Sequence, residues 1–276
     1  MKHRTYHDLT EADRSRMGEQ VAGQRRRVED RLSEVKRVVA VMSGKGGVGK
    51  SYITSILAHG LARRLTGGVG VIDADLSGPT AARLLNARGP LVVDEEGVHP
   101  AAGRDGIRVM STDLLLPEGN PMRWRGSQQD GFVWRGALEA GTLREFLGDV
   151  VWGQLDLLLV DLPPGSNRLQ DLIELVPGLT GALAVTIPTE DSRRSVERAM
   201  QAARDAEVPL LGVVENMSGA TCEDCGVRAP LFPGDAGRAL ADQFGVALMG
   251  SIPFTRSTEP PEEIGVLVDA LLRTLS

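Results

Sequence analysis

Short apolar runs alternate along the chain with stretches of helical periodicity. The apolar runs predict strands at 38–42, 70–74, 107–111, 156–161, 182–187, 209–214 and 247–252. Between them, apolar residues recur every three or four positions, which predicts helices near 49–65, 79–87, 136–148, 190–206, 235–244 and 261–274. Strands with consecutive apolar residues are buried on both faces, so we expect an α/β fold with a mostly parallel sheet covered by helices on both faces. Ligands of such sheets bind at the carboxyl ends of the strands.

The first 37 residues follow a different pattern. They contain ten basic and seven acidic residues. Their apolar residues at helical spacing are Val21, Val28, Leu32 and Val35. This pattern predicts a charged helix over roughly 10–35. We therefore divide the chain into a charged helical extension, residues 1–37, and a single P-loop-type α/β domain, residues 38–276.

Composition narrows the possible partners. The chain has 276 residues with 31 basic and 37 acidic side chains, a net charge of −6. A protein that binds nucleic acid over a broad surface is usually basic, so we expect no nucleic-acid partner. The polar start does not resemble a secretory signal, and no apolar run approaches the length of a membrane span. We expect a cytoplasmic protein with no membrane partner.

The most specific motif is GKGGVGKS, which lies between a predicted strand and a predicted helix. It fits the G-x-x-x-x-G-K-[ST] pattern, in which backbone N–H groups surround phosphate oxygens. We expect Lys50 to reach the β- and γ-phosphates and the Ser51 hydroxyl to bind Mg²⁺. The predicted nucleotide-binding residues of this loop are Gly44, Lys45, Gly46, Gly47, Val48, Gly49, Lys50 and Ser51.

Carboxylates follow two other predicted strands at the same edge of the sheet. Asp73 and Asp75 end the strand in VIDADLSGPT, and Asp161 ends the strand in LLLVDLPPG. Mg²⁺ and an attacking water both need oxygen ligands near the γ-phosphate. We expect Asp161 beside the water shell of Mg²⁺, Asp75 orienting the attacking water, and Asp73 supporting the metal shell. The sequence does not separate the roles of Asp73 and Asp75, and Asp75 could instead cap the next turn.

Cys222 and Cys225 are the only cysteines, and they form a Cys-x-x-Cys pair. Zinc and iron–sulfur clusters usually take four protein ligands, so this pair is half of a metal site. The four histidines are scattered, so a second copy of the chain is the expected source of the other two ligands. Structural zinc at a dimer seam, a redox dithiol and two inert thiols remain alternatives.

A second lysine, Lys45, precedes Lys50 in the same loop. The resulting KGGVGKS sequence resembles the deviant Walker A motif of an ATPase group that includes MinD, ParA and the nitrogenase iron protein. This resemblance implies that Lys45 reaches across a homodimer to the nucleotide of the other subunit. A solvent-exposed loop lysine is the alternative.

Several motifs together resemble Mrp/ApbC-type iron–sulfur cluster carrier ATPases. In order along the chain they are GKGGVGKS, DADLSGPT, FVWRG, VDLPPG, VENMS followed by Cys-x-x-Cys, and SIP. The resemblance covers about residues 36–270. It implies a weak ATPase that binds ATP and Mg²⁺ and, as a homodimer, holds a bridging [4Fe–4S] cluster on Cys222 and Cys225. Cluster donors and apoproteins would be its partners, and Asn216 would contact adenine.

The sequence departs from this family pattern at three places. DLPPGSNR replaces the usual DLPPGTGD, IPTE (187–190) replaces the usual TPQ, and Tyr52 replaces a common Ser or Thr. These departures leave open a scaffold that binds nucleotide, hydrolyses it poorly and holds structural zinc. The other alternative is a positioning or partition ATPase of the MinD or ParA type. An ATPase of that type would not need the cysteine pair.

Overall fold

The computed structural model describes residues 11–76, 78–115, 141–165, 168–221, 227–255 and 261–276. The helices are α1 (Glu11–Leu32), α2 (Lys50–Ala62), α3 (Ala81–Leu84), α5 (Arg168–Leu175), α6 (Glu190–Asp205), α7 (Ala236–Phe244) and α8 (Ile264–Leu275). The strands are β1 (Val38–Met42), β2 (Val69–Asp73), β3 (Val92–Val93), β4 (Val98–His99), β5 (Ala101–Ala102), β6 (Arg108–Ser111), β7 (Leu157–Asp161), β8 (Gly181–Thr186), β9 (Leu210–Thr221), β10 (Arg228–Ala229) and β11 (Leu248–Phe254). Residues 141–148 are also helical.

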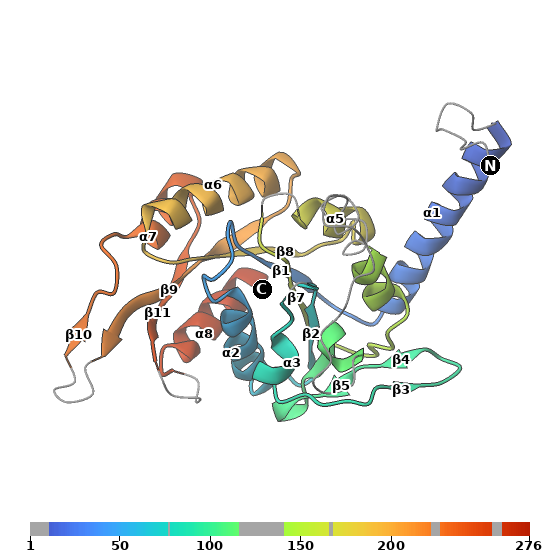
Figure 1. Ribbon diagram of the computed structural model, residues 1–276, viewed down its shortest axis with the longest axis horizontal. Helices are drawn as coiled ribbons and strands as arrows, with labels where there is room; N and C mark the ends of the chain where they lie inside the picture. The colour runs from blue at the N-terminus through green and yellow to red at the C-terminus, as the bar shows by residue number, and fades with distance from the viewer. Residues whose placement is uncertain (1–10, 77, 116–140, 166–167, 222–226, 256–260) are drawn as a thin grey trace, which may run out of the picture.

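The main sheet has the order β10-β9-β8-β1-β7-β2-β6-β5, with β11 paired to β9 (Figure 1). Its central strands are parallel, because β1 pairs in parallel with both β7 and β8 and β2 pairs in parallel with β6 and β7. The short strands β5 and β10 are antiparallel to their neighbours. The predicted mostly parallel α/β fold is confirmed.

Strand β1 is buried on both faces because its side chains alternate between two apolar cores. Val39 and Val41 pack with the apolar faces of α2, α3 and α8. Val38, Ala40 and Met42 pack with those of α5, α6 and α7. Figure 1 shows these two groups of helices on opposite faces of the sheet. Because β1 is packed on both faces, it fixes the position of the loop that leaves its carboxyl end.

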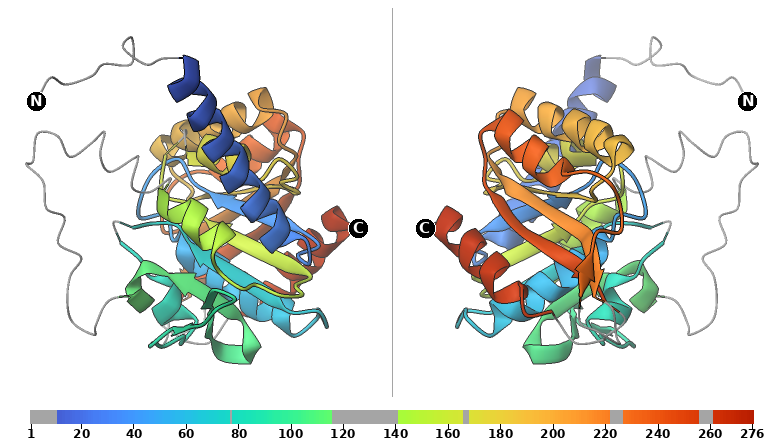
Figure 2. Two further views of the ribbon diagram at one scale, coloured as in Figure 1. Left: turned by 90° about the vertical axis from the view of Figure 1, so that its right-hand side faces the viewer. Right: turned by 90° about the vertical axis from the view of Figure 1, so that its left-hand side faces the viewer.

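Helix α1 confirms the predicted N-terminal helix and joins one of these cores near its C-terminal end. Val28 is 1% exposed and packs in the core of the α6 face. The Arg27 guanidinium lies 3.2 Å from the Asp149 carboxylate, and Arg31 Nε donates to the Gly148 carbonyl over 3.3 Å. Figures 1 and 2 show the opposite end of the helix projecting beyond the body. The division at residue 37 stays a prediction, although part of α1 packs with the domain.

Several elements differ from the predicted ones. Helix α3 is shorter than the predicted 79–87 helix, and Asn86 just beyond it adopts a left-handed φ of 53°. Helix α5 was not predicted. Part of the predicted 136–148 helix lies outside the described residues. Within the described part of the chain, no helix is long and apolar enough to cross a membrane.

Strand β9 continues well beyond the predicted 209–214 run. Its additional residues are paired with β11, and this pairing is irregular: Asn216 faces Ile252, whereas Ala220 faces Phe254. Between these two pairs, Met217 has a left-handed φ of 55°. Between these pairs β9 advances four residues and β11 two, and such a bulge bends the strand, so the second half of β9 runs in a direction set by this bulge.

Candidate nucleotide-binding site

The glycine-rich loop leaves β1 at the point where the crossover connections change direction. The chain passes from β1 to α2 on one face of the sheet and from the adjacent β7 to α5 on the other face. A crevice at such a point is the usual ligand site of an open α/β sheet. The predicted phosphate loop therefore lies where the topology favours binding.

Two features explain the glycines of the loop. Gly47 and Gly49 both have φ of 80°, a backbone conformation that other residues adopt at a cost. A Cβ on Gly44 would overlap the backbone of Ser195 at α6. The loop is thus wrapped tightly between β1 and α2, as the motif predicts, and its first glycine is required for packing against a different helix.

Lys50 is buried at the start of α2 and is paired with Asp161. The Lys50 ammonium lies 2.6 Å from Asp161 Oδ1, and the two side chains are 6% and 0% exposed. The Thr54 hydroxyl also lies within 3.0 Å of this oxygen. Asp161 Oδ2 is buried and has no hydrogen-bond partner among the described residues. An unpaired buried carboxylate oxygen is costly, so this atom fits a water molecule of a Mg²⁺ shell.

Asp73 lies next to Asp161 in the β2–β7 register, but its carboxylate has different hydrogen-bond partners. Its Oδ2 accepts hydrogen bonds from the backbone N–H groups of Thr80 and Ala81, over 2.8 and 2.9 Å. Burial, followed by the nearby Asp161 carboxylate, raises the pKa of Asp73 to about 6. These contacts tie α3 to the end of β2. A role for Asp73 in the metal shell stays a prediction.

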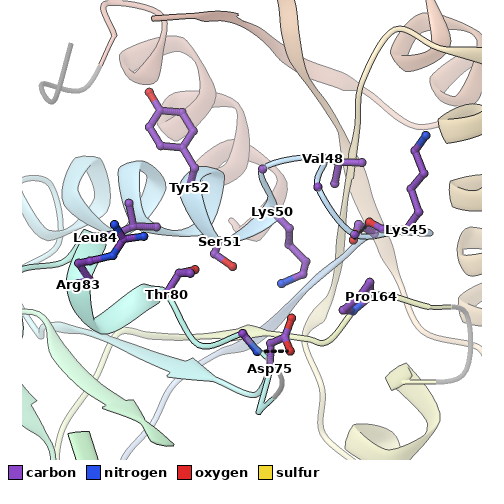
Figure 3. A pocket seen from close by; sticks show the side chains of 15 residues that line it. Lys45, Val48, Lys50, Ser51, Tyr52, Asp75, Thr80, Arg83, Leu84 and Pro164 are labelled. Carbon is purple, nitrogen blue, oxygen red and sulfur yellow. Dashed lines mark hydrogen bonds between the residues drawn. The ribbon is translucent and has the colours of Figure 1, made fainter. Parts of the chain in front are cut away.

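Asp75 and Lys50 approach one cavity from different elements (Figure 3). The cavity has a volume of about 330 Å³. It is lined by Ser43, Lys45, Gly46, Gly47, Val48, Gly49, Lys50, Ser51, Tyr52, Asp75, Gly78, Thr80, Arg83, Leu84 and Pro164. Asp75 Oδ1 accepts a hydrogen bond from the Gly78 N–H over 3.3 Å, so its loop is compact. The structure thus brings the predicted loop, both lysines and Asp75 together at one cavity.

Asn216 lies behind the loop rather than among the residues that line the cavity. It is 3% exposed, and its Nδ2 donates to the Val48 carbonyl over 2.9 Å. A Cβ on Gly49 would overlap this amide. Asn216 therefore supports the phosphate loop from strand β9. Its predicted contact with adenine stays a prediction.

The sequence patterns do not indicate Thr80, Arg83 and Leu84 as part of this site. They belong to the segment that follows Asp75, and α3 brings them to the outer wall of the cavity. The feature of the sequence that points to these residues is that their segment directly follows a strand that ends at the ligand-binding edge of the sheet. Helical spacing alone did not indicate which of its residues face the loop.

The two lysines of the loop have different surroundings. Lys45 is only partly buried, and Figure 3 shows its side chain directed away from that of Lys50. It has no ion pair with the residues that the structure describes. Cys222 and Cys225 lie outside the described residues. Within the described ranges, no cluster of three or more His, Cys, Asp or Glu residues could hold a metal ion.

Known proteins resemble this chain over most of its length. A family model described as ParA, NUBPL iron-transfer P-loop NTPase, matches residues 34–270. An iron-sulfur cluster carrier protein of Saccharolobus solfataricus is 38% identical over 92% of this chain and 83% of its own length. A protein of the same name from Methanococcus maripaludis is 36% identical over 92% of this chain and 84% of its own length.

Solved structures share the fold of this chain. A nucleotide-binding protein from Archaeoglobus fulgidus in complex with ADP is 34% identical, with a TM-score of 0.71, and covers 89% of this chain and 93% of its own. The cell division ATPase MinD of Pyrococcus furiosus shares the fold at 18% identity, with a TM-score of 0.57 over 87% of this chain and 99% of its own. The family resemblance predicted from the motifs is confirmed, and the chain belongs to the ParA/NUBPL family of iron-transfer P-loop NTPases.

Proposed function

We propose that this protein is a carrier of iron–sulfur clusters whose cluster site is controlled by ATP. The observation that carries the proposal is the buried Lys50–Asp161 pair, with an Asp161 oxygen that has no hydrogen-bond partner in the described part of the chain, in a chain whose relatives are named iron-sulfur cluster carrier proteins. The carrier would work in the cytoplasm, where cysteine thiols stay reduced.

The nucleotide would lie in the glycine-rich loop. Lys50 would contact its phosphates, the Ser51 hydroxyl would bind Mg²⁺, and Asp161 Oδ2 would accept a hydrogen bond from a water of the metal shell. A phosphate near Lys50 would compete with Asp161 for the ammonium. Asp75 would orient the attacking water in a slow hydrolysis. Lys45 would contribute its charge to the nucleotide of a second subunit.

The cluster is the cargo of this protein. Cys222 and Cys225 supply two thiolates from each chain, so a homodimer would complete the four ligands of a bridging [4Fe–4S] cluster. The strands on either side of these cysteines are held together, because Thr221 of β9 pairs with Arg228 of β10. Cluster donors would load this site, and apoproteins would receive its cluster. Zinc is the alternative occupant.

Anaerobic reconstitution tests this proposal. The wild-type chain, incubated with iron and sulfide, should gain about four iron atoms per two chains and migrate as a dimer. The Cys222→Ala/Cys225→Ala variant lacks every cysteine of the chain and should lose the cluster while it still binds ATP. Iron and sulfide retained by this variant, or zinc alone in protein purified without oxygen, would contradict the cluster assignment.

The role of ATP has a separate test. Cluster transfer to an apoprotein such as an apo-ferredoxin should differ between ATP-bound and ADP-bound carrier, because nucleotide state would bias the arrangement of the dimer through Lys45 and the turn after Asp161. The Lys50→Ala variant, loaded with cluster, should transfer at one rate with either nucleotide. An equal rate for both nucleotides in the wild type would contradict control by ATP.

A further inference from the structure

The outer wall of the cavity carries a cation that the phosphate-loop motif does not include. Arg83 of α3 lines the cavity together with its neighbour Leu84 and with Tyr52 of α2. The guanidinium of Arg83 has no ion pair with the residues that the structure describes. An arginine stays charged at any physiological pH, and its planar N–H groups match the geometry of phosphate oxygens.

The direction of a bound nucleotide follows from the loop itself. Lys50 and Asp75 line the cavity where a phosphate loop holds the terminal phosphates. The nucleotide would then run past Ser51 and Tyr52 at the start of α2, where the α-phosphate and the ribose would lie. Figure 3 shows Arg83 on the same side of the cavity as Ser51 and Tyr52, and Lys45 and Pro164 on the opposite side.

Arg83 is held at this wall by contacts that do not involve its own side chain. Asp73 accepts hydrogen bonds from the N–H groups of Thr80 and Ala81, which start α3. The Leu84 N–H donates to the Thr80 carbonyl over 3.0 Å, and Leu85 is fully buried. The backbone of Arg83 is therefore fixed to the same edge of the sheet as the phosphate loop, while its side chain is exposed to the cavity.

We propose that Arg83 binds the α-phosphate and ribose portion of the nucleotide. This inference rests on the proposed function, since it assumes a nucleotide in the loop. Arg83 contributes equally to the binding of ATP and ADP, because both contain the α-phosphate. The difference between the two nucleotides, the γ-phosphate, falls to Lys50 and Asp75 and not to Arg83.

Titration of the full chain with Mg-ATP and Mg-ADP tests the inference. Loss of a charge-assisted contact typically weakens binding by roughly 10- to 100-fold. The Arg83→Ala variant should lose affinity for both nucleotides within this range, with an unchanged ratio of the two dissociation constants. Arg83→Lys, which keeps the charge but not the planar donors, should lie between Arg83→Ala and the wild type. Unchanged affinity, or weaker binding of ATP alone, would overturn the assignment.

A nearby arginine provides the matched control. Arg88 is exposed and follows α3, but it does not line the cavity. Arg88→Ala should bind both nucleotides as the wild type does; an equal loss in this variant would mean that general surface charge, not Arg83, is responsible. Lys50→Ala tests the underlying function separately. If Lys50→Ala binds nucleotide like the wild type, the proposed site fails, whatever Arg83→Ala does.

Discussion

The floor and the outer wall of the cavity differ in how their charges are held. We call the buried group beneath the cavity its floor: Lys50 lines the cavity and contacts Asp161 and Thr54, which are buried behind it. Arg83 on the outer wall is exposed, Lys45 on the opposite side of the cavity is partly so, and neither has an ion pair with the residues that the structure describes. The comparison shows that one site uses cations of two kinds. The buried lysine is part of the folded core, whereas the outer cations are available to a ligand or to a second subunit.

The largest expected effect on stability comes from removing one partner of the buried Lys50–Asp161 pair. Asp161→Ala leaves the Lys50 ammonium buried without its counter-charge, and removal of one partner from a buried ion pair typically costs about 3–5 kcal/mol. We expect the free energy of unfolding, measured by urea denaturation, to fall by that amount. Lys50→Met/Asp161→Leu removes both charges and should recover much of the loss. A double variant as unstable as Asp161→Ala would show that the pair itself is not the cause.

A smaller effect is expected from the first glycine of the loop. Gly44→Ala would force a Cβ against the backbone of Ser195, and overpacking of this kind typically costs about 1–3 kcal/mol. Gly46→Ala is the matched control, because its nearest neighbour would be Pro164 Cγ at 3.9 Å, an ordinary contact. Thermal unfolding should separate the two variants. Equal melting temperatures would contradict the close packing of the loop on α6.

The buried Asp73 should make the stability of the folded protein depend on pH. Its pKa is raised from 3.8 to about 6, so the folded state binds a proton more readily than the unfolded chain. Stability from this group is therefore present below about pH 4 and is lost as pH rises to about 6, by up to about 1.4 kcal/mol per pH unit. The stability of the wild type relative to Asp73→Asn should fall over this range, as measured by urea denaturation at each pH.

A carboxyl group of the opposite kind serves as the control for Asp73. A hydrogen bond from Lys36 lowers the pKa of Asp156, so its contribution is present at neutral pH and is lost only on acidification. The wild type relative to Asp156→Asn should therefore lose no stability between pH 4 and pH 6. Parallel curves for the two variants would contradict the assignment of the pH dependence to Asp73.

The smallest effect on folding is expected from Lys45. Because its ammonium is not buried in an ion pair, Lys45→Ala should change the free energy of unfolding by less than about 0.5 kcal/mol. If Lys45 acts on the nucleotide of a second subunit, wild-type ATP hydrolysis per chain should rise with protein concentration, and the variant should lack this rise. A variant that keeps the rise would assign Lys45 to its own subunit or to solvent.

Local patterns predicted which segments meet at the site. The apolar run of β1, the glycines after it and the carboxylate at the end of β7 each lie within a few consecutive residues. Their spatial meeting then follows from the rule that parallel strands end at one edge. The family of the chain followed from the order of such motifs.

Contacts between distant segments explain what could not be predicted. Asn216 supports Val48 across 168 residues, and no local pattern distinguishes this contact from one with a base. The extension of β9 is rich in polar and small residues and is a strand because β11 pairs with it. Helix α5 has eight residues, too few for a clear period. The position of Arg83 depends on the hydrogen bonds of Asp73 to the start of α3.

The bulge in β9 lies between the residue that supports the phosphate loop and the residues that precede the cysteines. On one side of Met217, Asn216 is fixed to the phosphate loop; on the other side, the strand continues to Thr221, the residue before Cys222. Met217, with its left-handed φ, lies between these two ends. The four steps from Met217 to Thr221 span roughly 13 Å of strand. One strand therefore connects a residue that holds the phosphate loop directly with the residue that precedes the first cysteine, and no interface between domains lies between them.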